Sequence, residues 1–184
     1  AKVVDKDVKL PEERQTSAET LEADTLEVLA DLNHASQKGL QTIFDSSVGR
    51  STVNHPLGGR YQITPTEASV QKLPVQHGVT TTASVMAQGF NPYVAEWSPY
   101  HGAAYAVIEA TARLVAAGAN WSKARFSYQE YFERMDKQAE RFGQPVSALL
   151  GSIEAQIQLG LPSIGGKDSM SGTFEELTVP PTLV

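Results

Sequence analysis

Apolar side chains recur at helical spacing in several stretches of the chain. The expected helices cover about 16–32, 33–44, 100–117, 128–141 and 145–160. In the first of them, Leu21, Val28 and Leu29 fall on one face. Pro145 is expected in the first turn of the last helix, and Gly160 is expected to end it.

β-branched residues mark the expected strands. The run over 78–86 is dense in Val and Thr and gives the strongest strand signal of the chain. Further strands are expected near 60–64, 161–173 and 177–183. Helices and strands follow one another in mixed order without an internal repeat, so the chain is predicted to form an α+β domain.

Composition and charge narrow the class of protein. The 184 residues are 41% hydrophobic and 20% charged, which is typical of a soluble globular protein with one sizeable core. The net charge of −6 argues against nucleic acid as a partner, and no apolar run is long enough to cross a membrane. The absence of Cys excludes disulfides and thiolate metal sites and indicates a reducing, cytoplasmic setting.

One glycine-rich segment carries a cation, a carboxylate and a hydroxyl in consecutive positions. Lys167, Asp168 and Ser169 directly follow Gly165 and Gly166, and glycines let the backbone turn and a ligand approach closely. Backbone N–H groups, Lys and Ser suit phosphate oxygens, and a carboxylate suits the Mg²⁺ that accompanies them. The segment is not a Walker A loop, because Asp168 stands where that pattern requires Ser or Thr. An ordinary loop with a Lys–Asp pair is the competing interpretation.

Two other positions are weaker candidates. Lys38 precedes a stretch rich in Gly, Ser and Arg that could bind an anion, although a solvated loop explains the same pattern. Glu109 and Arg113 are four residues apart on an expected helix, so they either form a surface ion pair or leave Glu109 free to reach a metal. The four histidines lack the spacing of a zinc site.

Five segments of the sequence together carry a resemblance to a known enzyme family. They lie at 36–49, 56–65, 79–84, 95–99 and 165–170, and the most specific is Gly-Gly-Lys-Asp-Ser-Met at 165–170. Combined, they resemble phosphoribosylformylglycinamidine synthase in its large single-chain form, from about residue 25 onward. The resemblance implies a fragment from the start of the second aminoimidazole-ribonucleotide-synthetase-like half of that enzyme. Residues 1–24 would then be a linker and 25–184 the synthetase-like domain.

The resemblance implies both a fold and a reaction. The fold would be that of the N-terminal domain of aminoimidazole ribonucleotide synthetase, an α+β domain with helices packed on one face of a sheet. The reaction would be that of a purine-biosynthetic ligase, which uses ATP, Mg²⁺ and ammonia from glutamine to convert formylglycinamide ribonucleotide into its amidine. The fragment would be inactive alone, since the remaining domains of the synthase supply much of the site.

Site residues follow from the resemblance position by position. Nucleotide or substrate would be bound by Lys38, Gly165, Gly166, Lys167 and Ser169, and a metal by Asp168 and Glu109. No catalytic base is identified. In the family a second, non-catalytic nucleotide is held through an acidic residue, a Glu and an Asn. The approximate counterparts here are His77, Glu109 and Arg113, so only the Glu is kept. Arg113 would then replace the charge of the metal and pair with Glu109.

The family pairs the sheets of its two halves, and this implies partners for an isolated copy. Such a copy is expected to self-associate, as a homodimer that mimics the native pair. Two interpretations from other classes compete with the enzyme fragment. One is a non-catalytic scaffold domain, and the other is a stand-alone module that binds nucleotides or anions.

Overall fold

The computed structural model describes residues 17–36, 38–44 and 51–184, which form five α-helices, one 3₁₀ helix and nine strands. The helices are α1 (Leu21–Ala30), α2 (Lys38–Phe44), α3 (Pro92–Trp97), α4 (Pro99–Ala116), η1 (Trp121–Lys123) and α5 (Ala139–Leu159). The strands are β1 (Leu57–Gly58), β2 (Thr64–Pro65), β3 (Ala68–Lys72), β4 (Ala83–Ala87), β5 (Phe126–Tyr131), β6 (Ser163–Ser169), β7 (Thr173–Phe174), β8 (Leu177–Thr178) and β9 (Thr182–Leu183).

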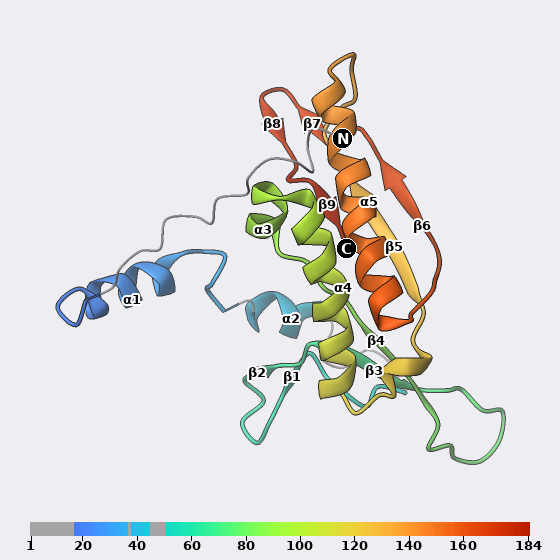
Figure 1. Ribbon diagram of the computed structural model, residues 1–184. Coiled ribbons are helices and arrows are strands. Elements are labelled where there is room, and N and C mark those ends of the chain that lie inside the picture. Colours follow the sequence, from blue (N-terminus) through green and yellow to red (C-terminus); the bar gives the residue numbers. More distant parts are fainter. Residues whose placement is uncertain (1–16, 37, 45–50) are drawn as a thin grey trace.

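The main sheet has three strands in the order β6-β5-β9. β5 pairs with β6 in parallel and with β9 antiparallel, and α5 provides the crossover between β5 and β6. The long helices α4 and α5 lie against each other and cover one face of this sheet (Figure 1). The predicted α+β fold with helices on one face of a sheet is therefore confirmed.

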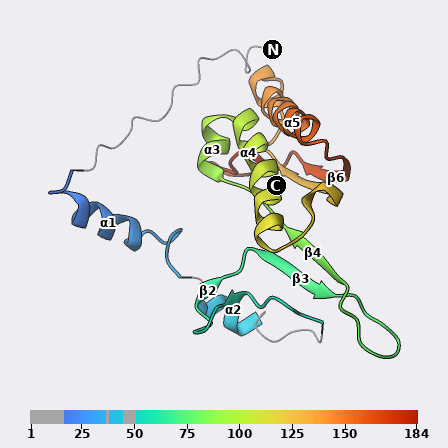
Figure 2. The same ribbon diagram turned by 60° about the horizontal axis from the view of Figure 1, so that its bottom comes forward.

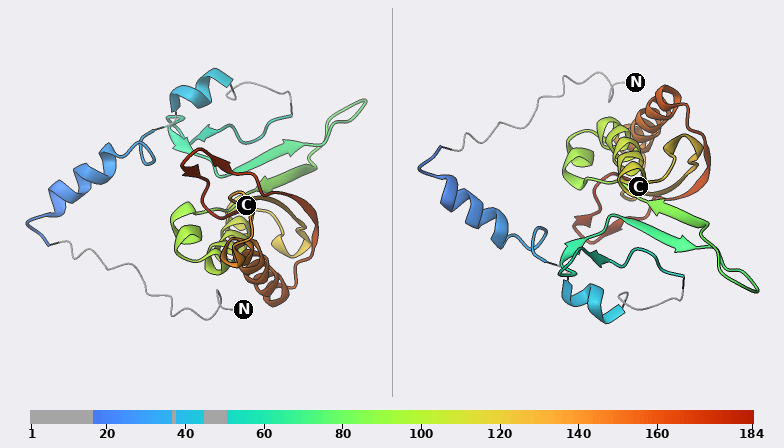
Figure 3. Two further views of the ribbon diagram at one scale, coloured as in Figure 1. Left: turned by 90° about the horizontal axis from the view of Figure 1, so that it is seen from above. Right: turned by 90° about the horizontal axis from the view of Figure 1, so that it is seen from below.

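A separate antiparallel pair, β3-β4, lies below the ends of α4 and β5 (Figure 2). Two smaller hairpins, β1-β2 and β7-β8, complete the strands. α1 lies apart from α4 and α5 in every view (Figure 3), and none of its residues is buried. The division at residues 24 and 25 falls within α1, so that boundary stays a prediction, and residues 1–16 lie outside the described part.

Small residues form the contact between the helices and the core. Ala103, Phe132, Ala148 and Leu183 make up the buried cluster; they come from α4, from the residue after β5, from α5 and from β9. A Cβ at Gly151 of α5 would collide with the carbonyl oxygen of Tyr100, so this glycine lets the two helices approach closely.

Helical spacing in the sequence predicts a core face of α4 made of Ala104, Val107, Ile108, Thr111, Leu114 and Val115, and this prediction is partly wrong. The buried face of α4 is the stripe of small residues around Gly102, Ala106 and Ala110, whereas Ile108 and Val115 are exposed.

Several expected elements differ from those observed. The helix expected over 128–141 is wrong for 128–138, because this segment begins as strand β5 and α5 starts only at Ala139. Pro145 therefore lies inside α5 rather than in its first turn. The strand near 60–64 is mostly a turn between β1 and β2, and in the 78–86 run the strand starts at Ala83.

Candidate functional site

The Gly165–Ser169 segment forms most of β6, an edge strand rather than a loop. On one side it pairs with β5, with Gly166 opposite Tyr128 and Ser169 opposite Tyr131. β6 stands at the end of the strand order, so its outer edge has no strand partner within the described residues. Gly165 to Asp168 are exposed. The segment thus offers backbone N–H and C=O groups to whatever lies beside it.

The structure requires glycine at positions 165 and 166 for two different reasons. Gly165 has φ +144°, a conformation that other residues rarely adopt, and it lies where the pairing register between β5 and β6 shifts. A Cβ at Gly166 would lie 2.5 Å from the carbonyl oxygen of Tyr128 and 3.0 Å from its Cβ. The close approach that we expected of a ligand at Gly166 is thus made by β5 itself.

The polar side chains of the segment make few contacts. Lys167 donates from Nζ to the carbonyl oxygen of Asp168 at 2.9 Å, and Ser169 Oγ lies 3.0 Å from Ser171 Oγ. Gln129 on β5 donates from Nε2 to the carbonyl oxygen of Lys167 at 3.1 Å. In a parallel pair, residues in register point to the same face of the sheet. Lys167 and Ser169 therefore share the face of Gln129, away from α4 and α5.

Sequence reasoning missed a buried carboxyl beside this segment. Glu130 on β5 is in register with Asp168 and is only 8% exposed. Burial raises the pKa of Glu130, and the nearby negative charge of Asp168 raises it further. Tyr128, two residues earlier, is partly buried, and its hydroxyl has no hydrogen-bond partner among the described residues. Burial raises the pKa of that phenol as well, with a smaller contribution from Glu130.

The alternation at Phe126, Tyr128, Glu130 and Phe132 was the available signal for this buried face. Its spacing is that of a half-buried strand. The helix expected from residue 128 onward does not place Glu130 on this buried face. The face of β5 that carries Glu130 is the one that α4 and α5 cover, because Phe132 on the same face belongs to the core cluster.

Glu109 and Arg113 form an ion pair at the junction of β3, β4 and α4. Arg113 Nη2 lies 2.9 Å from Glu109 Oε1, and Arg113 Nε lies 2.6 Å from Glu67 Oε2. Arg113 also donates from Nη1 to the carbonyl oxygen of Gln88, and Glu109 accepts from the N–H of Phe90, both at 2.8 Å. The expected pairing of Arg113 with Glu109 is confirmed, and a metal-ligand role of Glu109 stays a prediction.

The structure does not bring all the predicted site residues together. Lys38 is exposed at the start of α2, which lies across α4 from β6 (Figures 1 and 2). Within the described residues, no group of three or more His, Cys, Asp or Glu side chains is arranged to hold a metal. The roles of Lys38 and Asp168 stay predictions. None of the helices described here is long and apolar enough to span a membrane.

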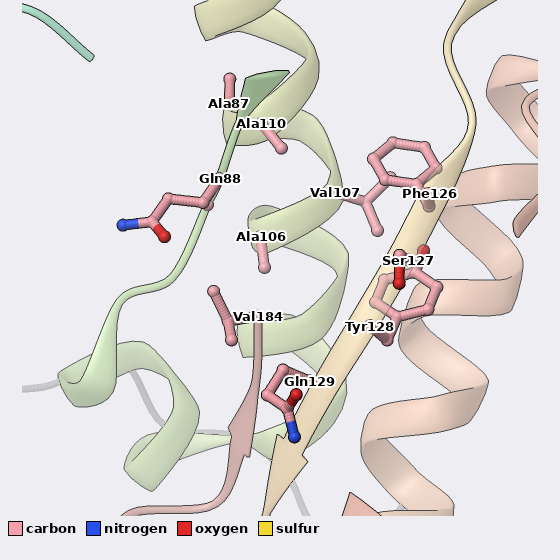
Figure 4. A pocket seen from close by; sticks show the side chains of 11 residues that line it. Ala87, Gln88, Ala106, Val107, Ala110, Phe126, Ser127, Tyr128, Gln129 and Val184 are labelled. Atoms are coloured by element: carbon pink, nitrogen blue, oxygen red, sulfur yellow. The ribbon is translucent and has the colours of Figure 1, made fainter. Parts of the chain in front are cut away.

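A cavity of about 210 Å³ lies between β4, α4 and β5 (Figure 4). Most of the lining residues are small and apolar. They come from the end of β4 and the two residues after it, from one face of α4, from the first part of β5 and from Val184. The lining residues are Ala87, Gln88, Gly89, Ala106, Val107, Ala110, Phe126, Ser127, Tyr128, Gln129 and Val184. No residue of the Gly165–Ser169 segment lines it, so this cavity and the β6 edge are separate features.

Comparison with known proteins identifies the fold. No protein-family model and no curated protein sequence matches the chain. Its α+β fold recurs in solved structures of proteins from Thermotoga maritima. PurLQS matches with a TM-score of 0.63 and 18% identity, over 95% of this chain and 24% of that one. PurL complexed with AMPPCP matches with a TM-score of 0.61 and 18% identity, over 84% and 24%.

Phosphoribosylformylglycinamidine synthase II from the same organism also matches. Its TM-score is 0.51 and its identity 18%, over 64% of this chain and 18% of that one. The chain therefore spans a quarter or less of the length of the solved proteins that it matches. The resemblance found in the sequence is confirmed at the level of the fold.

Proposed function

We propose that this chain is part of an ATP-dependent ligase of purine biosynthesis, related to phosphoribosylformylglycinamidine synthase. The whole enzyme would convert formylglycinamide ribonucleotide into its amidine with ammonia from glutamine, and the chain would be inactive without the remaining domains. Two independent lines support this proposal. They are the fold shared with PurL, which has been solved with AMPPCP, and the synthase-like motif at 165–170.

The observation that carries the proposal is the position of this motif on an exposed edge strand. Gly165 to Asp168 face solvent along β6, and within the described residues Lys167 Nζ donates to a single neutral acceptor, the carbonyl oxygen of Asp168. A polyphosphate could replace that single neutral bond with charge-assisted ones, which are about twice as strong. The edge would form an open half of a site, which a second lobe closes.

Each residue of the segment has a proposed role. Lys167 would bind phosphate oxygens as a cation, while the backbone N–H of Gly166, which alternation along β6 directs to the outer edge, would donate to the nucleotide and Gly165 would leave room for it. Ser169 would donate to the substrate. Bound ATP would supply the phosphoryl group that activates the substrate amide, and Mg²⁺ would neutralise phosphate charge; such transfers depend on positioning and on charge stabilisation.

Metal ligation is proposed for two carboxylates, Asp168 and Glu109. Asp168 fits the hard oxygen ligands that Mg²⁺ prefers, and its side chain is exposed. Glu109 would have to exchange its contact with Arg113 for the metal. Lys38 would reach the nucleotide phosphates from α2 only after a rearrangement or through another domain. The proposed setting is the cytoplasm, with the other synthase domains as partners.

A scaffold role is the second candidate, and one observation favours it. Gly166 is already explained by the carbonyl oxygen of Tyr128, so the glycine pair does not require a ligand. In this alternative, β6 is an edge strand that simply joins α5 to β7. A stand-alone nucleotide- or anion-binding module is a third candidate, with β6 as its anion site.

Titration with Mg²⁺-ATP tests the proposal. Calorimetry on the chain should show binding that Lys167→Ala and Ser169→Ala each weaken about tenfold or more, since a lost charge-assisted hydrogen bond costs about 1.5–3 kcal/mol. Lys72→Ala is the matched control, because Lys72 is an exposed lysine at the end of β3. Equal binding by all variants would contradict the role of β6, and Asp168→Ala in a full-length synthase should lower turnover.

A further inference from the structure

The cavity beside β5 has the form of a slot for one missing strand. β9 pairs with β5 at Thr182 and Leu183, and the pairing continues through Val184. The N–H of Gln129 donates to the carbonyl oxygen of Val184 at 2.9 Å, and the N–H of Val184 donates to that of Gln129 at 3.0 Å. The cavity begins directly beyond this pair, since both residues line it.

The backbone of Ser127 points into this slot. Successive residues of a strand direct their N–H and C=O groups to opposite edges. Phe126 and Phe132 bond toward β6, through Pro162 and Ser169, whereas Gln129 bonds toward β9. Ser127 precedes Gln129 by two residues, so its N–H and C=O face the same side as those of Gln129. No strand of the described chain occupies that side of Ser127.

β4 borders the slot on its other side. It pairs with β3 along one edge, and the outer edge of β3 is bonded to the chain at Ser51 and Val53. The described part of the chain contains no strand on the second edge of β4. In Figure 4, the chain after Ala87 and the first half of β5 run in the same direction, while β9 runs toward Val184 in the opposite one. A strand in line with β9 would therefore be antiparallel to both.

The floor of the slot suits narrow apolar side chains. Ala106, Val107 and Ala110 of α4 lie on it, and all three are buried. Gly89 brings the chain after β4 onto α4, because a Cβ there would collide with the carbonyl oxygen of Ala106. The side chains of an added strand that face α4 would have to be small or β-branched.

We propose that this slot receives a β-strand that extends β9 past Val184, antiparallel to β5. The added strand would join β3-β4 and β6-β5-β9 into one continuous sheet under α4 and α5. The β5–β9 ladder continues directly into the slot at Val184, and this continuity supports an added strand there. This inference rests on the proposed function only in treating the chain as part of a longer polypeptide.

The test appends a short segment of alternating Val and Thr residues after Val184. Amide hydrogen exchange should then slow at Ser127 about tenfold or more, because the N–H gains a strand partner. A Gly-Ser segment of equal length is the control and should leave the exchange at Ser127 unchanged. Equal exchange at Ser127 with both segments would overturn the proposal.

Two substitutions at Ser127 sharpen the result. Ser127→Pro removes the N–H that faces the slot, at a position whose N–H is not used toward β6. Ser127→Ala keeps it. The Val-Thr segment should raise the urea midpoint of the Ser127→Ala chain and not that of the Ser127→Pro chain. An equal rise in both would contradict a strand paired at Ser127.

A second copy of the chain is the other source of a strand, and the same measurement distinguishes it. If exchange at Ser127 in the unextended chain slows as the protein concentration rises, a second copy fills the slot and the proposal is wrong. None of these measurements uses a nucleotide. A failed slot proposal is therefore distinguishable from a failure of nucleotide binding at β6.

Discussion

Gly166→Ala separates the packing role of this glycine from a ligand-binding role. The new Cβ would lie 2.5 Å from the carbonyl oxygen of Tyr128 and 3.0 Å from its Cβ, both closer than ordinary contacts. β6 would have to move away from β5, against the parallel pairing that holds it. Overpacking of this kind costs about 1–3 kcal/mol. With a urea m-value of about 2 kcal/mol/M, the midpoint should fall by about 0.5–1.5 M.

Gly39→Ala is the control for this measurement. Gly39 lies in α2, and nothing stands within 4 Å of the Cβ that it would gain. Alanine also has the higher helix propensity, so this variant should be neutral or slightly more stable. Urea denaturation followed by circular dichroism compares the two variants. If Gly166→Ala unfolds at the same midpoint as wild type but binds Mg²⁺-ATP more weakly, the glycine serves a ligand and the packing explanation is refuted.

Three further predictions follow from the same geometry. Arg113→Met should lower the free energy of unfolding by about 1 kcal/mol, because it breaks partly exposed ion pairs with Glu67 and Glu109. The control is Arg125→Met, since Arg125 donates to the carbonyl oxygen of Ala124. If urea denaturation shows no larger effect for Arg113→Met than for this control, the ion-pair cluster does not stabilise the fold. The pKa of Glu130 is raised in the folded state. Its contribution to the free energy of unfolding is therefore fully present below the usual carboxyl pKa of about 4.3, and it is lost as the pH rises through the raised pKa of the folded state. Glu130→Gln should therefore flatten the fall in urea midpoint as the pH rises above about 4, and a fall as steep as in wild type would refute the assignment. The free edge of β6 should also make the chain self-associate at micromolar concentration, and sedimentation as a clean monomer would contradict this.

The sequence predicted α4, α5 and the extended character of 163–169 because these segments carry strong local signals. α5 ends at Gly160, which has φ +67° as a C-terminal glycine should. β5 could not be recognised so easily. Tyr128 and Phe132 are four residues apart, which suits a helix, but they are also two positions apart along a strand face. Parallel pairing with β6, a contact across more than thirty residues of chain, decides between the two.

The chemistry of the site was predicted in part for the same reason. The motif at 165–170 could be read directly, and the Glu109–Arg113 pair follows from helix geometry. The structural reason for a glycine at position 166 could not be predicted, since it depends on which strand lies beside β6. Glu130 was missed because its burial depends on α4 and α5 covering one face of β5.

The most direct test of nucleotide binding at β6 is the amide spectrum of the chain during titration with Mg²⁺-AMPPCP. Amide signals of Gly165 to Ser169 should shift in a saturable way, and Lys167→Ala should raise the nucleotide concentration at half-saturation about tenfold or more while Lys72→Ala leaves it unchanged. Shifts confined to the cavity under α4, or β6 signals that stay unchanged at saturating nucleotide, would contradict binding at this edge.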